Sequence, residues 1–324
     1  MEKDNKNIKS ILKEMESKFG EGSVMNFDSS KIKEVEVISS GSLLLDKALG
    51  VGGYPKGRII EIFGPESSGK TTMTLLAIAE AQKAGKKAAF IDAEHAIDPK
   101  WAQLLGVNLK DLVISQPDSG EQAFEILDHL TTTGLFDLIV IDSVAALVPT
   151  VELEGTAYDQ TIGAQARLMS KGLRKISGSL NKTGTTVIFI NQIREKIGVM
   201  FGNPETTPGG RALKFYSTMR LDIRLRERLK DKDVFIGQRV KIKVVKNKAA
   251  PPYKEAQPII NYSYGIDKFD ELVELATGEG IVERAGSWYS YNGTKIGQGK
   301  DAAISYIKEN KLYDEIYKKL FGKK

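Results

Sequence analysis

The amino-acid sequence predicts an α/β protein with a mostly parallel central sheet that helices cover on both faces. Between about residues 35 and 265, short apolar runs alternate with helical stretches, which is typical of this fold class. A run that fits G-x-x-x-x-G-K-[ST], from Gly64 to Thr72, lies between a strand-like and a helix-like segment, as a phosphate-binding loop requires. A smaller α/β pattern begins after about residue 265, so we expect a second, smaller domain.

The composition narrows the class of protein. The 324 residues are 41% hydrophobic and 27% charged, as in a soluble globular protein with a large core. No apolar run approaches the roughly 18 residues of a membrane span, and the N-terminus is polar, so we expect a cytoplasmic protein without a membrane partner. The sequence has no cysteine, which excludes disulfides, thiolate metal sites and cysteine nucleophiles.

The first 20 residues predict an amphipathic helix. Its apolar stripe has the i, i+3, i+4, i+7 spacing and consists of Ile8, Ile11, Leu12, Met15 and Phe19. A short helix with one such stripe must pack on something. The helix could dock on the core of its own chain or on a neighbouring subunit, and both alternatives are open.

The middle of the chain predicts the sheet. Four apolar strand-like runs are Arg58–Phe63, Lys87–Asp92, Leu138–Asp142 and Thr186–Asn191, with helical stretches such as Glu121–Leu130 and Ala164–Leu180 between them. Two later runs, Thr218–Leu225 and Gln238–Lys246, alternate apolar with charged residues. We expect them to continue the sheet as half-exposed, antiparallel strands.

A boundary follows near Pro251-Pro252 and Tyr262–Gly265. From Glu283 onward the chain has nine Lys and Arg against five Asp and Glu, which favours a polyanionic partner. We therefore expect three parts: residues 1–34 as helix and linker, 35–265 as the core, and 266–324 as a small basic domain.

The phosphate-binding loop carries the strongest chemical signal. Its glycines let backbone N–H groups turn toward an anion, and the following helix directs its positive end there. Lys70 can reach the β- and γ-phosphates, and the Thr71 hydroxyl can ligate Mg²⁺. An acidic residue, Asp142, ends another apolar strand and can support the same metal. The alternative, an ordinary glycine-rich connector, does not explain this combination.

Hydrolysis of a triphosphate also needs a group that orients water. Glu94 follows a strand on the same side of the sheet and is the candidate base, with Asp92 as its rival and an ordinary exposed loop carboxylate as the alternative. Gln192 ends a further strand and can hydrogen-bond a γ-phosphate oxygen. It leads into the long loop Ile193–Arg211.

This loop and one helix indicate a nucleic-acid partner. The loop has cationic side chains for phosphates (Arg194, Lys196 and Arg211) and apolar ones for bases (Ile197, Val199, Met200 and Phe201). The helix Ala164–Leu180 has a second, cationic stripe at Arg167, Lys171 and Arg174. A mobile surface loop and a solvated helix face are the alternatives.

Together these residues resemble the RecA family of bacterial recombinases, over essentially the whole chain to about residue 310. The most specific stretches are Gly64–Thr72, Phe90–Pro99, Ile141–Leu147 and Phe189–Tyr216. The resemblance implies a RecA-type P-loop core with an N-terminal docking helix and a C-terminal domain that binds duplex DNA. It implies a DNA-dependent ATPase that needs ATP and Mg²⁺, forms a helical homopolymer on single-stranded DNA, and exchanges strands with double-stranded DNA. It leaves open loader proteins and an SOS-type repressor, for which the filament would act as co-protease.

The resemblance also implies roles for individual residues. Glu94 would activate water, Gln192 would sense the γ-phosphate, and Lys246 and Lys248 would reach the ATP of the neighbouring subunit, so that with Lys70 they form the catalytic set. The nucleotide and its Mg²⁺ would contact Gly64, Pro65, Glu66, Ser67, Ser68, Gly69, Lys70, Thr71, Thr72, Asp98, Trp101, Asp142 and Tyr262. The first DNA loop would be about Glu152–Gly163 and would continue into Arg167, Ser170 and Arg174. DNA would contact Ile162, Gly163, Arg167, Ser170, Arg174, Arg194, Gly198, Met200, Phe201, Gly209, Gly210, Arg211, Arg284 and Lys300.

Some positions depart from the family pattern. Trp101 stands where a tyrosine is usual, and a larger ring still stacks on adenine. Arg211 stands where some relatives have asparagine and adds positive charge. The chain ends with a basic segment in place of an acidic tail, so we expect less restrained duplex capture through Arg284 and Lys300. Three functions remain distinct: a motor-like recombinase, a nucleotide-gated DNA scaffold, and a helicase or repair ATPase without strand exchange, for which the match over residues 193–216 gives no reason.

Overall fold

The computed structural model describes residues 2–20, 24, 35–156, 163–195, 202 and 204–322. The chain divides into two units, Met1–Val35 and Glu36–Lys324, which are described separately. The first contains the expected helix, α1 (Glu2–Phe19), on which Ile8, Ile11 and Phe19 are exposed. None of the helices in the described part of the chain is long and apolar enough to cross a membrane.

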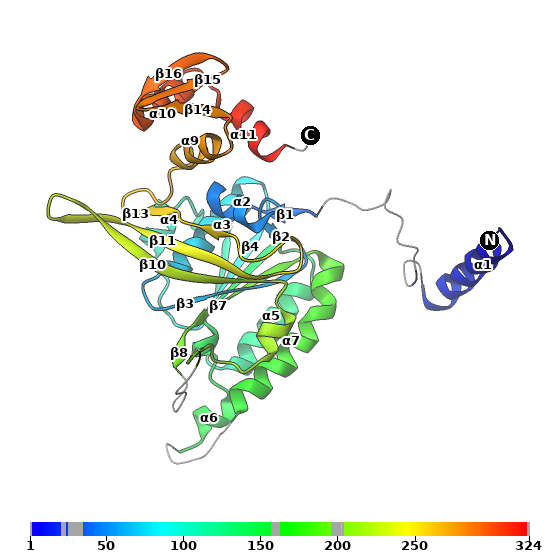
Figure 1. The fold of residues 1–324 in the computed structure, drawn as a ribbon. Helices are drawn as coiled ribbons and strands as arrows, with labels where there is room; N and C mark the ends of the chain where they lie inside the picture. Colours follow the sequence, from blue (N-terminus) through cyan, green and yellow to red (C-terminus); the bar gives the residue numbers. More distant parts are fainter. Residues whose placement is uncertain are drawn as a thin grey trace. The chain divides into compact units, whose positions relative to one another are not determined.

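The second unit is built on a mixed sheet of nine strands among the described residues. Six run parallel in the spatial order β5, β4, β6, β7, β3, β10, and β11 then pairs antiparallel with β10 and carries β12 and β13. Their bounds are β3 (Ile59–Gly64), β4 (Ala88–Asp92), β5 (Leu112–Ser115), β6 (Leu138–Asp142), β7 (Thr186–Gln192), β10 (Met219–Asp231), β11 (Val234–Asn247), β12 (Glu255–Ala256) and β13 (Ile259–Asn261). Figure 1 shows β10 and β11 as one long hairpin.

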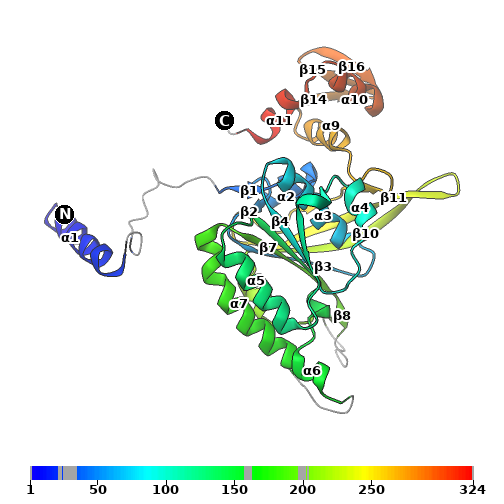
Figure 2. The ribbon, with the colours of Figure 1, turned by 180° about the vertical axis from the view of Figure 1, so that it is seen from behind.

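Helices cover both faces because side chains of the central strands alternate between two cores. Ile60 and Ile62 pack with α2 (Leu43–Leu49), α3 (Lys70–Lys83) and α4 (Pro99–Leu104). Ile59 and Phe189 pack on the other face with α5 (Gly120–Thr132), α7 (Ala164–Thr183) and α8 (Ala212–Tyr216). Both ribbon views show α5 and α7 side by side (Figure 1, Figure 2). Short elements complete the core: β1 (Val37–Ile38), β2 (Tyr54–Pro55), β8 (Arg194–Glu195), β9 (Glu205–Thr206), η2 (Leu109–Asp111), η3 (Val144–Ala146) and α6 (Thr150–Glu154).

The structure corrects four expectations. All of the run Thr218–Leu225 except Thr218 lies in β10, which pairs parallel, not antiparallel, with β3; only its pairing with β11 is antiparallel. β5 is an additional parallel strand at the sheet edge that the sequence did not indicate. The loop Ile193–Arg211 is not wholly irregular, because its described ends pair as β8 and β9. The first part of the segment Glu152–Gly163 belongs to helix α6.

The last part of the chain has a core of its own. It contains α9 (Lys268–Gly278), β14 (Val282–Ala285), β15 (Trp288–Tyr291), β16 (Thr294–Gln298), α10 (Lys300–Glu309) and α11 (Tyr313–Phe321). Ile316 and Leu320 of α11 are buried in this core. Most of the basic C-terminal segment is therefore a packed helix.

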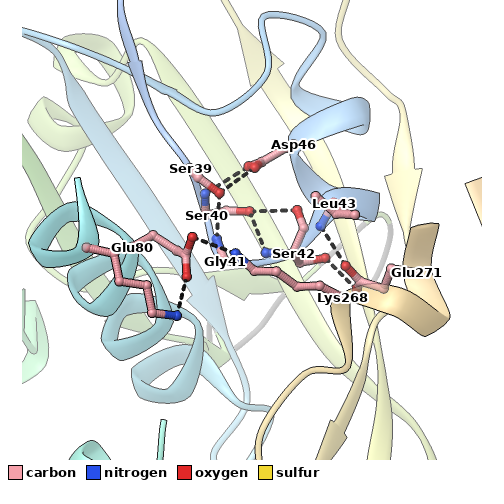
Figure 3. A network of polar contacts seen from close by, with 10 residues as sticks. Ser39, Ser40, Gly41, Ser42, Leu43, Asp46, Glu80, Lys268 and Glu271 are labelled. Atoms are coloured by element: carbon pink, nitrogen blue, oxygen red, sulfur yellow. Dashed lines mark hydrogen bonds and ion pairs between the residues drawn. The ribbon is translucent and has the colours of Figure 1, made fainter. Parts of the chain in front are cut away.

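A buried polar network joins α9 to the core (Figure 3). The Glu271 carboxylate accepts hydrogen bonds from the Ser42 hydroxyl (2.8 Å) and the Leu43 amide (2.6 Å) at the start of α2. One turn earlier, Lys268 pairs with Glu80 of α3 (2.5 Å). Because α3 begins at the phosphate loop, the ion pair between Lys268 and Glu80 links α9 to a helix that also forms part of the nucleotide site.

Candidate nucleotide and DNA-binding site

The phosphate loop follows the carboxyl end of β3, where two glycines permit its path. A Cβ on Gly64 would lie 2.0 Å from the Ile223 carbonyl oxygen, so this strand end can pass β10 only without a side chain. Gly69 has φ +93°, in the left-handed region, where the chain turns into α3. The loop amides and the N-terminus of α3 can therefore face an anion.

Lys70 points back into this loop. Its Nζ donates hydrogen bonds to the carbonyl oxygens of Gly64 (3.1 Å) and Pro65 (2.6 Å). Burial lowers the pKa of Lys70, and the nearby carboxylates of Asp142 and Glu94 oppose that shift. A phosphate group would replace the carbonyl oxygens as the partner of this ammonium group.

Thr71 and Asp142 form an oxygen pair that fits Mg²⁺. The Thr71 hydroxyl donates to Asp142 Oδ2 at 2.6 Å. Burial raises the pKa of Asp142 to about 6, the hydrogen bond from Thr71 lowers it, and Glu94 raises it further. Among the described residues no group of three or more His, Cys, Asp or Glu could hold a metal. Mg²⁺ characteristically takes one or two protein oxygens and completes its shell with phosphate and water.

A cavity of about 500 Å³ adjoins the loop. It is lined by Ser67, Ser68, Gly69, Lys70, Thr71, Thr72, Trp101, Gln238, Ile260 and Tyr262. The Trp101 indole N–H donates to the Thr72 hydroxyl (3.2 Å), and the Tyr262 hydroxyl donates to Gln238 Oε1 (3.3 Å). The two predicted aromatic side chains thus line one pocket. Gln238 and Ile260 were missed, because the sequence placed Gln238 only at the start of a strand-like run and assigned Ile260 to no element.

Asp98, which is also predicted to contact the nucleotide, lies at the start of the helix that carries Trp101. Its carboxylate accepts hydrogen bonds from the backbone amides of Lys100 (2.8 Å) and Trp101 (3.3 Å) as the N-cap of α4. It does not line the cavity. Asp98 therefore orients the turn that carries Trp101.

The two candidate bases differ in how their oxygens are used. Asp92 is buried and accepts hydrogen bonds from Ala96 N (3.1 Å), Ile97 N (3.3 Å) and Gln116 Nε2 (3.1 Å). Glu94 is exposed and accepts at a single oxygen, Oε1, from the Ser143 hydroxyl and from Gln192 Nε2 (3.1 Å). Asp92 is committed to holding its loop, so the geometry favours Glu94 as the base. Ser143 was not among the predicted site residues.

Gln192 connects this carboxylate to the second predicted DNA loop. Its backbone N–H donates a hydrogen bond to the Asn191 Oδ1 (3.0 Å). Directly after it, β8 pairs with β9, setting Arg194 opposite Thr206. Arg224 of β10 grips β9 through both oxygens of Glu205 (2.8 and 2.6 Å). The predicted contacts Gly198, Met200 and Phe201, and with them Lys196, Ile197 and Val199, lie outside the described residues.

Two distant segments of the predicted DNA surface lie side by side. The Gly209 amide donates to Gln165 Oε1 in the first turn of α7 (3.2 Å), and a Cβ on Gly210 would lie 2.8 Å from the Cβ of Ala166. Both glycines have positive φ. Arg211 is exposed beside them. Of the residues predicted on α7 and its cap, Gly163, Arg167 and Arg174 are exposed and Ser170 is half-buried, whereas Ile162 is outside the described residues.

Lys246 and Lys248 lie away from the phosphate loop of their own subunit. Strand pairing sets Lys246 beside Arg220, which is level with Glu61 in the middle of β3, and Lys248 follows the end of β11. The phosphate loop follows the other end of β3, at Gly64. Neither lysine is among the described residues that line the nucleotide cavity.

The two residues predicted to contact duplex DNA in the last domain have partners within the chain. Lys300 pairs with Asp270 (2.7 Å) and Glu274 (3.4 Å). The Arg284 guanidinium lies over the Tyr289 ring (5.5 Å) and donates to the Gly286 carbonyl. Lys300 must leave two carboxylates to bind phosphate.

Comparison with known proteins agrees with this geometry. A family model described as the RecA N-terminal domain matches residues 6–267, and one described as the RecA C-terminal domain matches residues 270–323. The chain is 58% identical over 303 residues to Protein RecA of Enterococcus gallinarum, which covers 94% of this chain and 87% of that protein. It is 57% identical over 316 residues to Protein RecA of Staphylococcus epidermidis and of Staphylococcus aureus, covering 97% of this chain and 90% and 91% of those proteins.

Proposed function

Since this chain belongs to the RecA family, we propose that its ATP site and its DNA-binding loops work as one switch in which Gln192 is the link. The chain is a DNA-dependent ATPase that forms filaments on single-stranded DNA and catalyses homologous pairing and strand exchange in recombinational repair. ATP and Mg²⁺ are its cofactors, and double-stranded DNA and further copies of the chain are its partners. An SOS-type repressor is a typical partner of this family.

One hydrogen bond supports the switch. Gln192 donates to Glu94, the candidate base, and is followed without a break by the β8–β9 ribbon at the root of the second DNA loop. A γ-phosphate that draws the Gln192 amide away would free Glu94 and pull on the ribbon. DNA binding and hydrolysis would then respond to the same side chain.

Each residue of the site has a defined task in this proposal. Lys70 exchanges its two carbonyl partners for phosphate oxygens, and Trp101 and Tyr262 enclose the base. Glu94 holds the attacking water in line and takes its proton. Mg²⁺, held by Thr71 and supported by Asp142, neutralises phosphate charge when it is bound.

The active site requires a second subunit. Lys246 and Lys248 lie toward the start of β3, far from the loop at its end, so they can supply positive charge only to the site of a neighbour. Residues 1–34 would dock one subunit on the next. Hydrolysis would therefore depend on filament assembly.

The remaining assignments complete the proposal. Residues 35–265 form the ATPase core, and 266–324 form the duplex-binding domain, with Arg284 and Lys300 as contacts. The backbone of Gly209, Gly210 and Arg211, and the adjacent face of α7, track the phosphates of the first strand. We place the protein in the cytoplasm.

The ATPase rate with and without single-stranded DNA tests the central proposal. We expect strong stimulation by DNA in the natural sequence. Gln192→Asn, whose amide is one methylene shorter, should bind Mg·ATP but lose the stimulation, whereas Gln257→Asn at an exposed strand end should behave as the natural sequence. Hydrolysis that is indifferent to DNA in the natural sequence would overturn the proposal.

A further inference from the structure

A buried carboxylate occupies the sheet face between the two halves of this switch. Glu61, in the middle of β3, has no exposed surface. It points to the same side as Ile59 and the α7–α8 layer, since Ile60 and Ile62 face α3. A carboxylate there is costly unless it is paired, and the mechanism above does not use it.

Glu61 is bonded on two sides. Its Oε1 accepts from Asn191 Nδ2 of β7 (3.1 Å), and its Oε2 accepts from Arg220 Nε of β10 (2.5 Å). Arg220 is itself largely buried and lies over the Phe63 ring (4.6 Å). Breaking such a pair on one side leaves an uncompensated charge.

The bonds of Asn191 lead to the nucleotide sensor. The Asn191 Oδ1 accepts the Gln192 amide, and its Nδ2 also donates to the Pro208 carbonyl (3.3 Å), directly before the DNA-facing glycines. One side chain thus fixes both ends of the second DNA loop. Glu61 fixes the orientation of that side chain.

Arg220 lies beside the lysine that the subunit would supply to its neighbour. Strand register sets Arg220 beside Lys246. Lys246 Nζ donates to the carbonyl oxygens of Lys214 (2.7 Å) and Phe215 (3.1 Å) at the end of α8. Burial, Lys248 and Arg220 lower the pKa of Lys246, whereas Glu61 raises it, so the charge of Glu61 opposes that of this cationic cluster.

We propose that Glu61 is a positioning residue that couples the nucleotide sensor of each subunit to the lysine it presents to the next one. The connection crosses four adjacent strands through Asn191, Glu61, Arg220 and Lys246. Glu61 is hydrogen-bonded to both Asn191 and Arg220, and strand register sets Arg220 beside Lys246. A displacement of Gln192 shifts Asn191, changes the hold of Glu61 on Arg220, and alters how firmly Lys246 stays on α8. This inference rests on the proposed function of Gln192 and Lys246.

The test replaces the charge while keeping the shape. In Glu61→Gln the amide oxygen still accepts from Asn191, but Arg220 loses its anion. We expect unchanged Mg·ATP affinity without DNA, about a tenfold lower kcat on single-stranded DNA, and loss of cooperativity in the ATP dependence of hydrolysis. Glu271→Gln makes the same replacement of Glu by Gln at another buried position, outside the nucleotide and DNA sites, and should retain that cooperativity.

A double variant separates coupling from folding. Glu61→Gln with Arg220→Gln removes both charges, so its thermal midpoint should recover toward the natural value, while cooperativity should stay lost. If Glu61→Gln alone is unstable, the double variant is compared with the natural sequence in its place. Recovery of cooperativity in the double variant, or normal hydrolysis in Glu61→Gln, would overturn the coupling role. If the natural sequence shows no stimulation by DNA, the proposed function itself fails, and the inference fails with it.

Discussion

At the scale of single residues, the hydrogen bonds of the two candidate bases favour Glu94 over Asp92. Asp92 and Glu94 are two positions apart after the same strand, and both suit proton transfer by residue type. Asp92 uses its oxygens to hold a loop turn, whereas Glu94 has one oxygen without a protein partner among the described residues and adjoins Gln192. Nothing in the spacing of Phe90–Pro99 distinguishes a carboxylate that caps a loop from one that faces the site, so spacing alone could not make this choice, and the family resemblance supported Glu94.

Replacement of Glu94 tests its role. Glu94→Gln keeps an acceptor for Ser143 but cannot take a proton, so ATP turnover should fall by about 10²–10⁴-fold. ATP-dependent filaments should still form, as electron microscopy can check. Glu125→Gln, at an exposed position of α5, is the matched control.

The same variant separates two ways of working. Strand exchange over short homology by Glu94→Gln filaments would mean that pairing uses binding energy and that hydrolysis serves release, as in a nucleotide-gated scaffold. Failure of Glu94→Gln to assemble would contradict a purely catalytic role for this carboxylate.

Elements were predictable where apolar periodicity is strong. The central strands and α5 and α7 were located to within a few residues, because buried parallel strands are continuously apolar. β5 was missed, since it is four residues long and exposes Val113 and Ile114 at the sheet edge. The β8–β9 ribbon was missed because its two-residue strands depend on Arg224, far away in the sequence. The phosphate loop, by contrast, could be placed because its chemistry is local.

The contact between α5 and α7 gives a matched pair of variants. A Cβ on Gly172 would lie 2.3 Å from the Phe124 ring, whereas a Cβ on Gly178 of the same helix would meet nothing within 4 Å. Gly172→Ala should lower the free energy of unfolding by about 1–3 kcal/mol through overpacking. Gly178→Ala should raise it by about 0.5–1 kcal/mol. Denaturant unfolding of both variants measures this, and equal effects would contradict the packing described.

The junction of α2 and α9 predicts a pH dependence of stability. Burial raises the pKa of Glu271 to about 8 from 4.5, although hydrogen bonds from Ser42 and Leu43 lower it. The unfolded chain therefore releases this proton at lower pH than the folded chain. The contribution is complete below about pH 4.5 and is lost as pH rises toward 8, by at most about 1.4 kcal/mol per pH unit.

Glu271→Gln should make this slope shallower. Asp46, which burial also shifts upward to about 6, keeps part of the dependence in both proteins. Calorimetric melting between pH 5 and 8 measures the slope, with Glu309→Gln at an exposed position as control. An unchanged slope in Glu271→Gln would show that this carboxyl titrates normally.

At the scale of the whole molecule, the role that we propose for Lys246 and Lys248 would make assembly part of catalysis. The sequence resemblance assigned these lysines to the site of the neighbouring subunit, and strand register supplies a physical reason. Both lysines lie toward the start of β3, whereas the phosphate loop of their own chain follows the end of β3. A single chain thus carries the parts of two half-sites.

Mixed filaments test this division. Lys248→Ala subunits retain Glu94, and Glu94→Gln subunits retain the lysines, so each is inactive alone. A mixture should recover part of the DNA-stimulated ATPase activity at contacts that join an intact Glu94 to intact lysines. A mixture of Lys248→Ala with Lys246→Ala should recover none. Absence of recovery in the first mixture, when both variants assemble, would place the lysines in their own subunit's site.

The positions of the two tryptophans give the protein separate optical reporters. Trp101 lines the nucleotide cavity with its indole N–H on Thr72, and Trp288 is 41% exposed in the last domain beneath the Lys295 ammonium (5.0 Å). The sequence has no other tryptophan. Stacking of a base on Trp101 alters its emission, whereas a DNA phosphate that draws Lys295 away alters that of Trp288. With either ring replaced by phenylalanine, the intrinsic fluorescence of the chain follows one ligand at a time, without any attached dye.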